Sequence, residues 1–312
     1  MTQKIGLVVD STCDLPRSFI DQHGIEIMPI NVHLGTILKK DTRDPDETME
    51  IYRRYVGQKD IEITTAPMSV KAIKDWFLDQ LVLKYDRVLV ITGSSTRSAT
   101  FENASKASFM ILSSYKEHRK AAGLDEQFAM RVLDSKTLFT GLAVTLYEAA
   151  RALKTQEDIL FDKLRQHIES FSQNVRGYLV PQDLYFLRSR ASQKGEKSVG
   201  WFSYQMGGML DTKPILEAYR GETNAVAKVR GFENAVKKLF EMASAAISAG
   251  LKTRVICMSY GGNPEEVKNF PGYAEFMKVA QANKVDVLLS VMSTSAGVQV
   301  GPGAFSLAYC EK

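Results

Sequence analysis

Four predicted β-strands in the first half of the chain each end in small hydroxyl residues, and this repeated pattern restricts the fold more than any other feature. The apolar runs span residues 4–9, 63–65, 88–91 and 130–133, and the hydroxyls at their ends are Ser11-Thr12, Thr64-Thr65, Ser94-Ser95 and Ser135 with Thr137. Predicted helices separate these strands, and such alternation is typical of a parallel, doubly wound sheet. Because parallel strands present their carboxyl ends at one edge, we expect the hydroxyls to form a polar binding site there.

The loop after residues 88–91 is the best candidate for the centre of that site. Its sequence, Thr-Gly-Ser-Ser-Thr-Arg-Ser, leads into a predicted helix that carries Ala104, Ala107 and Ile111 at helical spacing. Free N–H groups and the dipole at a helix N-terminus favour an anion. The sequence contains no acidic residue between Val88 and Phe101. The alternative, that the hydroxyls only cover a surface turn, remains open.

A chain of 312 residues is long enough for two domains. We predict an N-terminal α/β domain over residues 1–170 with a parallel doubly wound sheet, including one strand over 25–34. A polar-faced helix over about 156–176 is expected to link the halves. Residues 171–312 form the predicted C-terminal α/β domain, with an antiparallel hairpin that turns at Gly221-Glu222.

Composition and motifs argue for a binding protein and against several other classes. The net charge of +4 is too small for a dedicated nucleic-acid binder, and the three separated cysteines fit a reducing compartment. With no apolar run of membrane-spanning length and no apolar leader, the sequence predicts a cytoplasmic protein. P-loop, GxGxxG, HExxH and GxSxG motifs are absent from the sequence. The four histidines have neither metal-ligand spacing nor a position suited to a general base. We therefore expect no catalytic residue, metal or cofactor.

Several short motifs occur in the order found in one known family. They are Asp10-Ser11-Thr12 with Asp14-Leu15-Pro16, Thr64-Thr65-Ala66-Pro67, Ser94-Ser95-Thr96-Arg97-Ser98-Ala99-Thr100, Asp134-Ser135-Lys136, Asp183-Leu184 with Leu187, Lys213-Pro214, Lys228-Val229-Arg230 and Gly301-Pro302-Gly303. With these motifs the sequence resembles the DegV family of bacterial fatty-acid-binding proteins over essentially its full length.

This resemblance implies that one long-chain fatty acid, such as palmitate, is held between two α/β domains. Its carboxylate is expected at the loops of the N-terminal domain and its tail in an apolar pocket of the C-terminal domain. The protein itself is then no enzyme, because a separate fatty acid kinase subunit phosphorylates the carboxylate to an acyl phosphate. By position, Thr64 and Ser95 would hold the carboxylate. The predicted carboxylate-binding residues are Thr64, Thr65, Ser94, Ser95, Arg97, Gln299 and Gly301.

Three departures from the family pattern affect the expected site. Gln299 stands where the family commonly has a histidine; it can donate a hydrogen bond but carries no charge. Arg97 replaces an apolar residue, and it either contacts the carboxylate in a bidentate manner or is a solvated loop arginine. Arg190 is displaced from the family's usual arginine position. With Lys228 and Arg230 it is predicted to contact the kinase or a phosphate, although this basic cluster could equally be a solvated face or touch an anionic membrane transiently.

A second function from another class remains open. The hydroxyls could bind a small hydroxylated or phosphorylated metabolite for a phosphotransfer system. An apolar tunnel would favour the fatty acid, whereas a small wet cleft would favour the metabolite.

Overall fold

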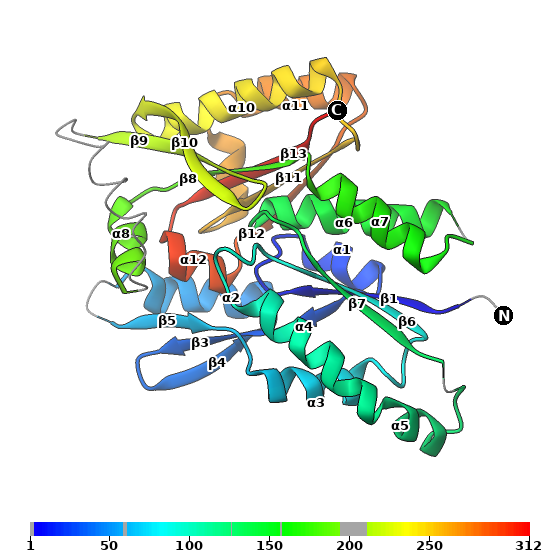
Figure 1. Ribbon diagram of the computed structural model, residues 1–312. Coiled ribbons are helices and arrows are strands. Elements are labelled where there is room, and N and C mark those ends of the chain that lie inside the picture. Colours follow the sequence, from blue (N-terminus) through cyan, green and yellow to red (C-terminus); the bar gives the residue numbers. More distant parts are fainter. Residues whose placement is uncertain (1–2, 59–60, 126, 157, 194–210) are drawn as a thin grey trace.

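The computed structural model describes residues 3–58, 61–125, 127–156, 158–193 and 211–312, which form three β-sheets surrounded by helices (Figure 1). Sheet A has the strand order β2-β1-β6-β7, sheet B the order β4-β3-β5, and sheet C the order β10-β9-β8-β13-β11-β12. The strands are β1 (Ile5–Asp10), β2 (Glu26–Met28), β3 (Ile30–Leu34), β4 (Ile37–Asp41), β5 (Ile63–Ala66), β6 (Arg87–Thr92), β7 (Ala129–Asp134), β8 (Val175–Val180), β9 (Thr212–Tyr219), β10 (Glu222–Arg230), β11 (Val255–Tyr260), β12 (Asp286–Val291) and β13 (Phe305–Cys310).

Helices connect the strands and cover the faces of sheets A and C. The α-helices are α1 (Arg17–Gln22), α2 (Pro45–Ile51), α3 (Val70–Gln80), α4 (Thr100–Met110), α5 (Tyr115–Ala121), α6 (Thr140–Thr155), α7 (Phe161–Ser172), α8 (Leu184–Gln193), α10 (Phe232–Ala249), α11 (Tyr273–Ala282) and α12 (Thr294–Val300). A π-helical turn η1 (Tyr52–Val56) and two 3₁₀ turns, η2 (Ile111–Ser113) and η3 (Pro264–Asn269), complete the described helical elements.

Helices α6 and α7 form the layer that joins sheets A and C (Figure 1). Helix α6 contacts β1 and β6 of sheet A and also β8, β11 and β13 of sheet C. Its buried Leu142, Leu146 and Ala149 share one hydrophobic core with Leu7 of β1 and Cys257 of β11. Helices α3 and α4 cover the other face of sheet A, and α10 and α11 cover the other face of sheet C. Sheets A and C therefore alternate with three helical layers, and sheet B packs beside them against α2, η1 and α12.

Sheet A confirms the predicted parallel arrangement. Strand β1 pairs in parallel with β2 and β6, and β6 pairs in parallel with β7. Alternate residues of β1 point to opposite faces, as the two-residue period of a strand requires. Leu7 and Val9 pack against α6, whereas Val8 packs against α3 and α4. Burial on both faces explains why these strands are apolar at nearly every position.

The prediction of one strand over residues 25–34 is wrong, because that stretch serves two sheets. Pro29 separates β2, which pairs with β1 in sheet A, from β3, which pairs with β4 and β5 in sheet B. Proline has no N–H group with which to continue a ladder. Strand β5, which carries the two threonines, was expected in the parallel sheet. It is instead antiparallel to β3 in sheet B.

Sheet C is mixed and contains the predicted antiparallel hairpin, formed by β9 and β10. Strands β11 and β12 are parallel, and the final strand β13 is antiparallel to both β8 and β11. The expected linking helix is shorter than predicted and is observed as α7. The division of the chain after residue 170 stays a prediction.

Candidate functional site

A cavity of about 340 Å³ lies where elements of all three sheets meet. Its wall comes from the loops after β1, β6 and β7, from β3 and β5, from the strands β8 to β10, from the start of α4, and from α8 and α12. The polar lining residues are Asp10, Thr12, Thr65, Ser94, Arg97, Ser98, Thr100, Thr223, Ser295 and Gln299. The others are Ile30, Pro67, Gly93, Ala99, Leu138, Phe139, Leu179, Leu187, Leu216 and Val300.

The loop after β6 is held in place by its own backbone and by neighbouring loops. The Ser94 N–H donates to the Thr137 carbonyl at 3.0 Å, and the Ser94 and Thr96 hydroxyls lie 2.9 Å apart. The Thr96 hydroxyl in turn donates to the Gly221 carbonyl in the β9–β10 turn at 2.6 Å. The loop thus connects sheet A with the hairpin of sheet C, and it presents the buried Ser94 to the cavity.

Asp10, at the end of β1, holds the same loop through hydrogen bonds. One of its carboxyl oxygens accepts the Gly93 N–H at 2.6 Å, and the other accepts the Thr12 N–H at 2.9 Å. Burial raises the pKa of Asp10, and the hydrogen bonds from Thr12 and Gly93 offset this only in part. The carboxyl group of Asp10 therefore fixes the loop geometry through acceptor contacts.

Helix α12 and strand β5 meet across the cavity through one side-chain hydrogen bond. Gln299 Nε2 donates to the Thr65 hydroxyl at 2.6 Å, although the two residues are 234 positions apart in the chain. Both residues line the cavity, so they place an amide and a hydroxyl side by side in its wall. Two neutral groups of this kind can donate hydrogen bonds to a ligand carboxylate.

Two charged side chains are present among the described lining residues, Arg97 and Asp10. Both oxygens of Asp10 accept hydrogen bonds from the protein. Arg97 is partly exposed, and its backbone N–H donates to the Ser94 carbonyl at 3.0 Å. Arg97 is thus the one basic residue among the described lining residues, and it belongs to the same loop as Ser94.

The structure brings four of the predicted carboxylate-binding residues to the cavity: Thr65, Ser94, Arg97 and Gln299. Thr64 lies on the other face of β5, where it pairs with the exposed His33. Ser95 is exposed, and its hydroxyl donates to Asp134 at 2.6 Å. Neither Thr64 nor Ser95 is among the lining residues. The positions that the family resemblance favoured are therefore each one residue away from a residue that faces the cavity.

Gly301 lies just beyond the lining residue Val300 and has a structural reason to be glycine. Its φ angle is +88°, and a Cβ atom there would approach the ring of Phe186 to 2.4 Å. Glycine therefore allows α8 to pack closely against the end of α12.

The three predicted partner contacts are not at the cavity wall. Lys228 and Arg230 lie on the exposed face of β10, at positions that alternate with partly buried ones. Arg190 belongs to α8, but its side chain lies outside the described residues. Their role toward a partner stays a prediction.

Ser295 was missed by the sequence interpretation although a signal was available. It lies in a Ser-Thr-Ser cluster one residue beyond the end of strand β12, which is close to the pattern that identified the other hydroxyl loops. It lines the cavity, and its buried hydroxyl has no hydrogen-bond partner among the described residues. Other atoms of Ser295 therefore contribute its share of the cavity wall, while the hydroxyl lies behind that wall.

The described part of the chain contains no group of three or more His, Cys, Asp or Glu side chains arranged to hold a metal ion. None of its described helices combines the length and apolarity needed to cross a membrane.

The family is shown by comparison with known proteins. A family model described as an uncharacterised protein of the DegV family matches residues 4–312. The chain belongs to the DegV family. It is 43% identical over 306 residues to a DegV domain-containing protein of Xanthomonas axonopodis pv. citri, an alignment that covers 98% of this chain and 97% of that protein.

Two proteins with lower sequence identity to this chain carry names that state the ligand they bind. A fatty acid-binding protein of Thermotoga maritima is 26% identical, with 96% of this DegV chain and 95% of that protein covered. The crystal structure of a stearic acid-binding protein from Eubacterium ventriosum superposes with a TM-score of 0.76 at 20% identity, covering 99% of this chain and 98% of the other. This structural likeness shows that the fold is shared.

Proposed function

We propose that this DegV protein binds one long-chain fatty acid in the 340 Å³ cavity. The observation that carries the proposal is that hydroxyl, amide and guanidinium donors share one cavity with an apolar wall. Leu138, Leu179, Leu187 and Leu216 supply much of that wall. The volume lies within the range of roughly 300–1,000 Å³ typical of small-molecule sites. Fatty acids are also the ligands named for the Thermotoga and Eubacterium relatives.

The two ends of such a ligand make different demands. Each buried methylene contributes about 0.8 kcal/mol, so the acyl chain supplies most of the affinity. The carboxylate needs donors, and Arg97, the free N–H of the Gln299 amide and the Thr65 hydroxyl beside it are placed to provide them. The donors then orient the ligand, so that its acid group lies at the polar side of the cavity.

The direct test of this proposal is mass spectrometry of the organic extract from purified protein. We expect a stoichiometric long-chain fatty acid, such as palmitate or a close homologue. An extract without lipid, together with no thermal shift on adding fatty acids, would contradict the proposal and favour a small polar metabolite as the ligand.

Gln299→Leu is expected to weaken binding of a fatty acid while sparing its methyl ester. A hydrogen bond to a charged group contributes about 1.5–3 kcal/mol, so the dissociation constant for the acid should rise roughly 10- to 100-fold. The measurement is displacement of a fluorescent acyl probe by the acid and by the ester. Gln281→Leu, on the exposed surface of α11, is the matched control. Equal losses for acid and ester would exclude contact with the carboxylate.

We also propose that the bound acid is presented to a separate kinase subunit and that the DegV chain acts as a carrier. In that reaction a carboxylate oxygen attacks the γ-phosphorus of ATP, which gives an acyl phosphate and releases ADP. Lys228 and Arg230 support such docking, because they put two positive charges on the exposed face of β10, and Thr223 on the opposite face of the same strand lines the cavity. Three buried free cysteines fit a reducing compartment, and we place the protein in the bacterial cytoplasm. The transient membrane contact stays a prediction.

The double variant Lys228→Ala/Arg230→Ala is expected to reduce acyl-phosphate formation with the partner kinase at least about tenfold, because charge complementarity increases association rates. Binding of the fatty acid itself should not change. Lys237→Ala/Lys278→Ala removes the same charge from α10 and α11 and serves as the control. Unchanged phosphorylation by the first variant would refute docking at this strand.

A further inference from the structure

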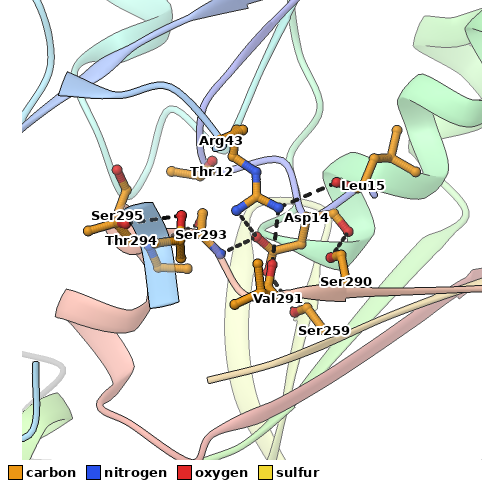
Figure 2. A network of polar contacts seen from close by, with 12 residues as sticks. Thr12, Asp14, Leu15, Arg43, Ser259, Ser290, Val291, Ser293, Thr294 and Ser295 are labelled. Carbon is orange, nitrogen blue, oxygen red and sulfur yellow. Dashed lines mark hydrogen bonds and ion pairs between the residues drawn. The ribbon is translucent and has the colours of Figure 1, made fainter. Parts of the chain in front are cut away.

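Asp14 lies in a buried loop after β1 and contacts the ends of two strands of sheet C (Figure 2). Its Oδ1 accepts the Ser293 N–H at 2.8 Å, and its Oδ2 accepts the Ser259 hydroxyl at 2.6 Å. Its main-chain carbonyl accepts the Ser290 hydroxyl at 2.8 Å. One residue near the start of the chain thus fixes β11, β12 and the residue before α12.

Arg43 completes this connection from the other side. Its guanidinium is 3.8 Å from the Asp14 carboxylate, with both side chains almost fully buried. Nη2 donates to the Val291 carbonyl at 3.1 Å and to the Leu15 carbonyl at 3.4 Å, so Arg43 spans the β1 loop and the end of β12 (Figure 2). The backbone of Arg43 is held at a φ of +62°, which a non-glycine residue rarely adopts.

Two further groups from the N-terminal half hold the start of α12. Asp41 accepts the Ser295 N–H at 2.8 Å, and the Tyr52 hydroxyl donates to the Ser293 carbonyl at 3.4 Å. Ser295 then faces the cavity, and Gln299, about one helical turn later, faces it as well. The orientation of both lining residues therefore depends on contacts with Asp14, Asp41 and Tyr52.

Stability alone does not explain the buried Asp14–Arg43 pair. Removing two charges from water costs several kcal/mol per ion, and apolar replacements of buried ion pairs are often neutral or stabilising. Arg43 also has Nε and Nη1 without a hydrogen-bond partner among the described residues. The Asp14–Arg43 pair is costly to bury, and its contacts hold the start of the helix that carries Ser295 and Gln299. We therefore look for its role in the position of that helix.

We propose that Asp14 and Arg43 are positioning residues for the ligand carboxylate. They fix the start of α12 relative to β5 and to the loop after β6, so that the Gln299 amide, on the helix that Ser295 begins, meets the acid group together with Thr65. The inference rests on the proposed function, because it assigns the network to the recognition of that ligand. Neither Asp14 nor Arg43 lines the cavity itself.

The test uses Asp14→Asn, which keeps the shape of the side chain but removes its charge and one acceptor. Binding of a long-chain fatty acid and of its methyl ester is measured well below the melting temperature of every variant. The acid should bind about tenfold more weakly, whereas the ester, which relies on the apolar wall, should change less than about twofold. Ser259→Ala, which removes one neutral donor to Asp14, is expected to change the acid-to-ester ratio in the same direction by about threefold.

A buried arginine that pairs with a partly exposed aspartate away from the cavity provides the control for a purely structural effect. Arg119 is 2% exposed, bonds to Asp86 at 2.9 Å, and lies among α3, α5 and sheet A rather than at the cavity. Arg119→Met should lower the melting temperature without changing the acid-to-ester ratio. If Asp14→Asn and Ser259→Ala lower the melting temperature but keep the wild-type ratio, the positioning role is wrong.

Failure of the proposed function has a different signature. If the proposed function is wrong, the wild-type protein binds neither the acid nor the ester, and the positioning role is then wrong as well. If instead the wild type prefers the acid strongly while both variants retain that preference, the function stands and the inference alone is overturned. If Asp14→Asn does not fold, the ratio measured for Ser259→Ala and for Arg43→Lys decides between these outcomes.

Discussion

Leu179→Trp is expected to weaken binding of a long-chain fatty acid by about 100-fold. Leu179 of β8 lines the cavity and pairs across the ladder with Leu216 of β9, which also lines it. An indole at this position occupies space that the acyl chain needs. Excluding about four methylenes from the wall removes about 3 kcal/mol of burial energy, which corresponds to a factor of about 100.

The dependence on chain length makes this prediction specific. A series of fatty acids of increasing length should show the largest loss for the longest chains, as measured by displacement of a fluorescent probe. Leu160→Trp places the same residue on a side chain that is 70% exposed and outside the cavity, so it should bind like the wild type. Wild-type affinity of Leu179→Trp for all chain lengths would place the acyl chain elsewhere.

Glu148→Ala is expected to lower the free energy of unfolding by about 3 kcal/mol. The Glu148 side chain is 2% exposed on α6 and receives two hydrogen bonds from Arg151, at 2.7 and 2.8 Å, and one contact from His167 of α7 at 2.7 Å. Its removal breaks charge-assisted bonds in the layer that joins sheets A and C. Arg151 and His167 are partly exposed, so water hydrates them once Glu148 is removed. The loss of unfolding free energy therefore stays near the lower end of the range of about 3–5 kcal/mol that follows removal of one partner of a buried ion pair.

The same carboxylate makes stability depend on pH in a defined direction. Burial opposes ionisation of Glu148, but hydrogen bonds from Arg151 and His167 outweigh it and hold its pKa below the usual 4.5. A lowered pKa contributes stability that is fully present above the unfolded pKa and is lost as the pH falls through the folded pKa. The stability difference between wild type and Glu148→Gln should therefore shrink as the pH falls below about 4.5.

Urea unfolding of wild type, Glu148→Ala and Glu148→Gln over that pH range provides the measurement. Glu102→Gln is the control, because the Glu102–Lys106 pair on α4 is exposed and should contribute nothing measurable. A stability difference that stays constant as the pH falls would show that Glu148 does not act as a buried ionised group.

Periodicity and turn chemistry were sufficient to predict the parallel sheet, the hairpin and most hydroxyl loops. Strands buried on both faces are apolar throughout, as in β6, and each ends in residues that cannot extend it. Sheet B was not predicted from the sequence. Strand β4 has the sequence Ile-Leu-Lys-Lys-Asp, a weak local signal, and its pairing with β3 decides whether it is a strand at all.

The types of residue at the candidate site were predictable, but their orientations were not. A strand such as β5 must turn one of its two threonines away from the cavity, and packing against β3 selects Thr65. The same limit applies to Ser94 and Ser95, where Asp134 engages the exposed hydroxyl.

The sequence by itself determined the fold class, the hydroxyl loops and the membership of the DegV family, because these depend on local pattern and on motif order. Only the tertiary structure decided which side chains share the cavity. Gln299 meets Thr65 across 234 positions, and Asp14 meets Ser293 across 279. The Asp14 contact arises where α6 and α7 pack sheets A and C together, and the Gln299 contact arises where α12 packs against sheet B. No local pattern in the chain records either geometry.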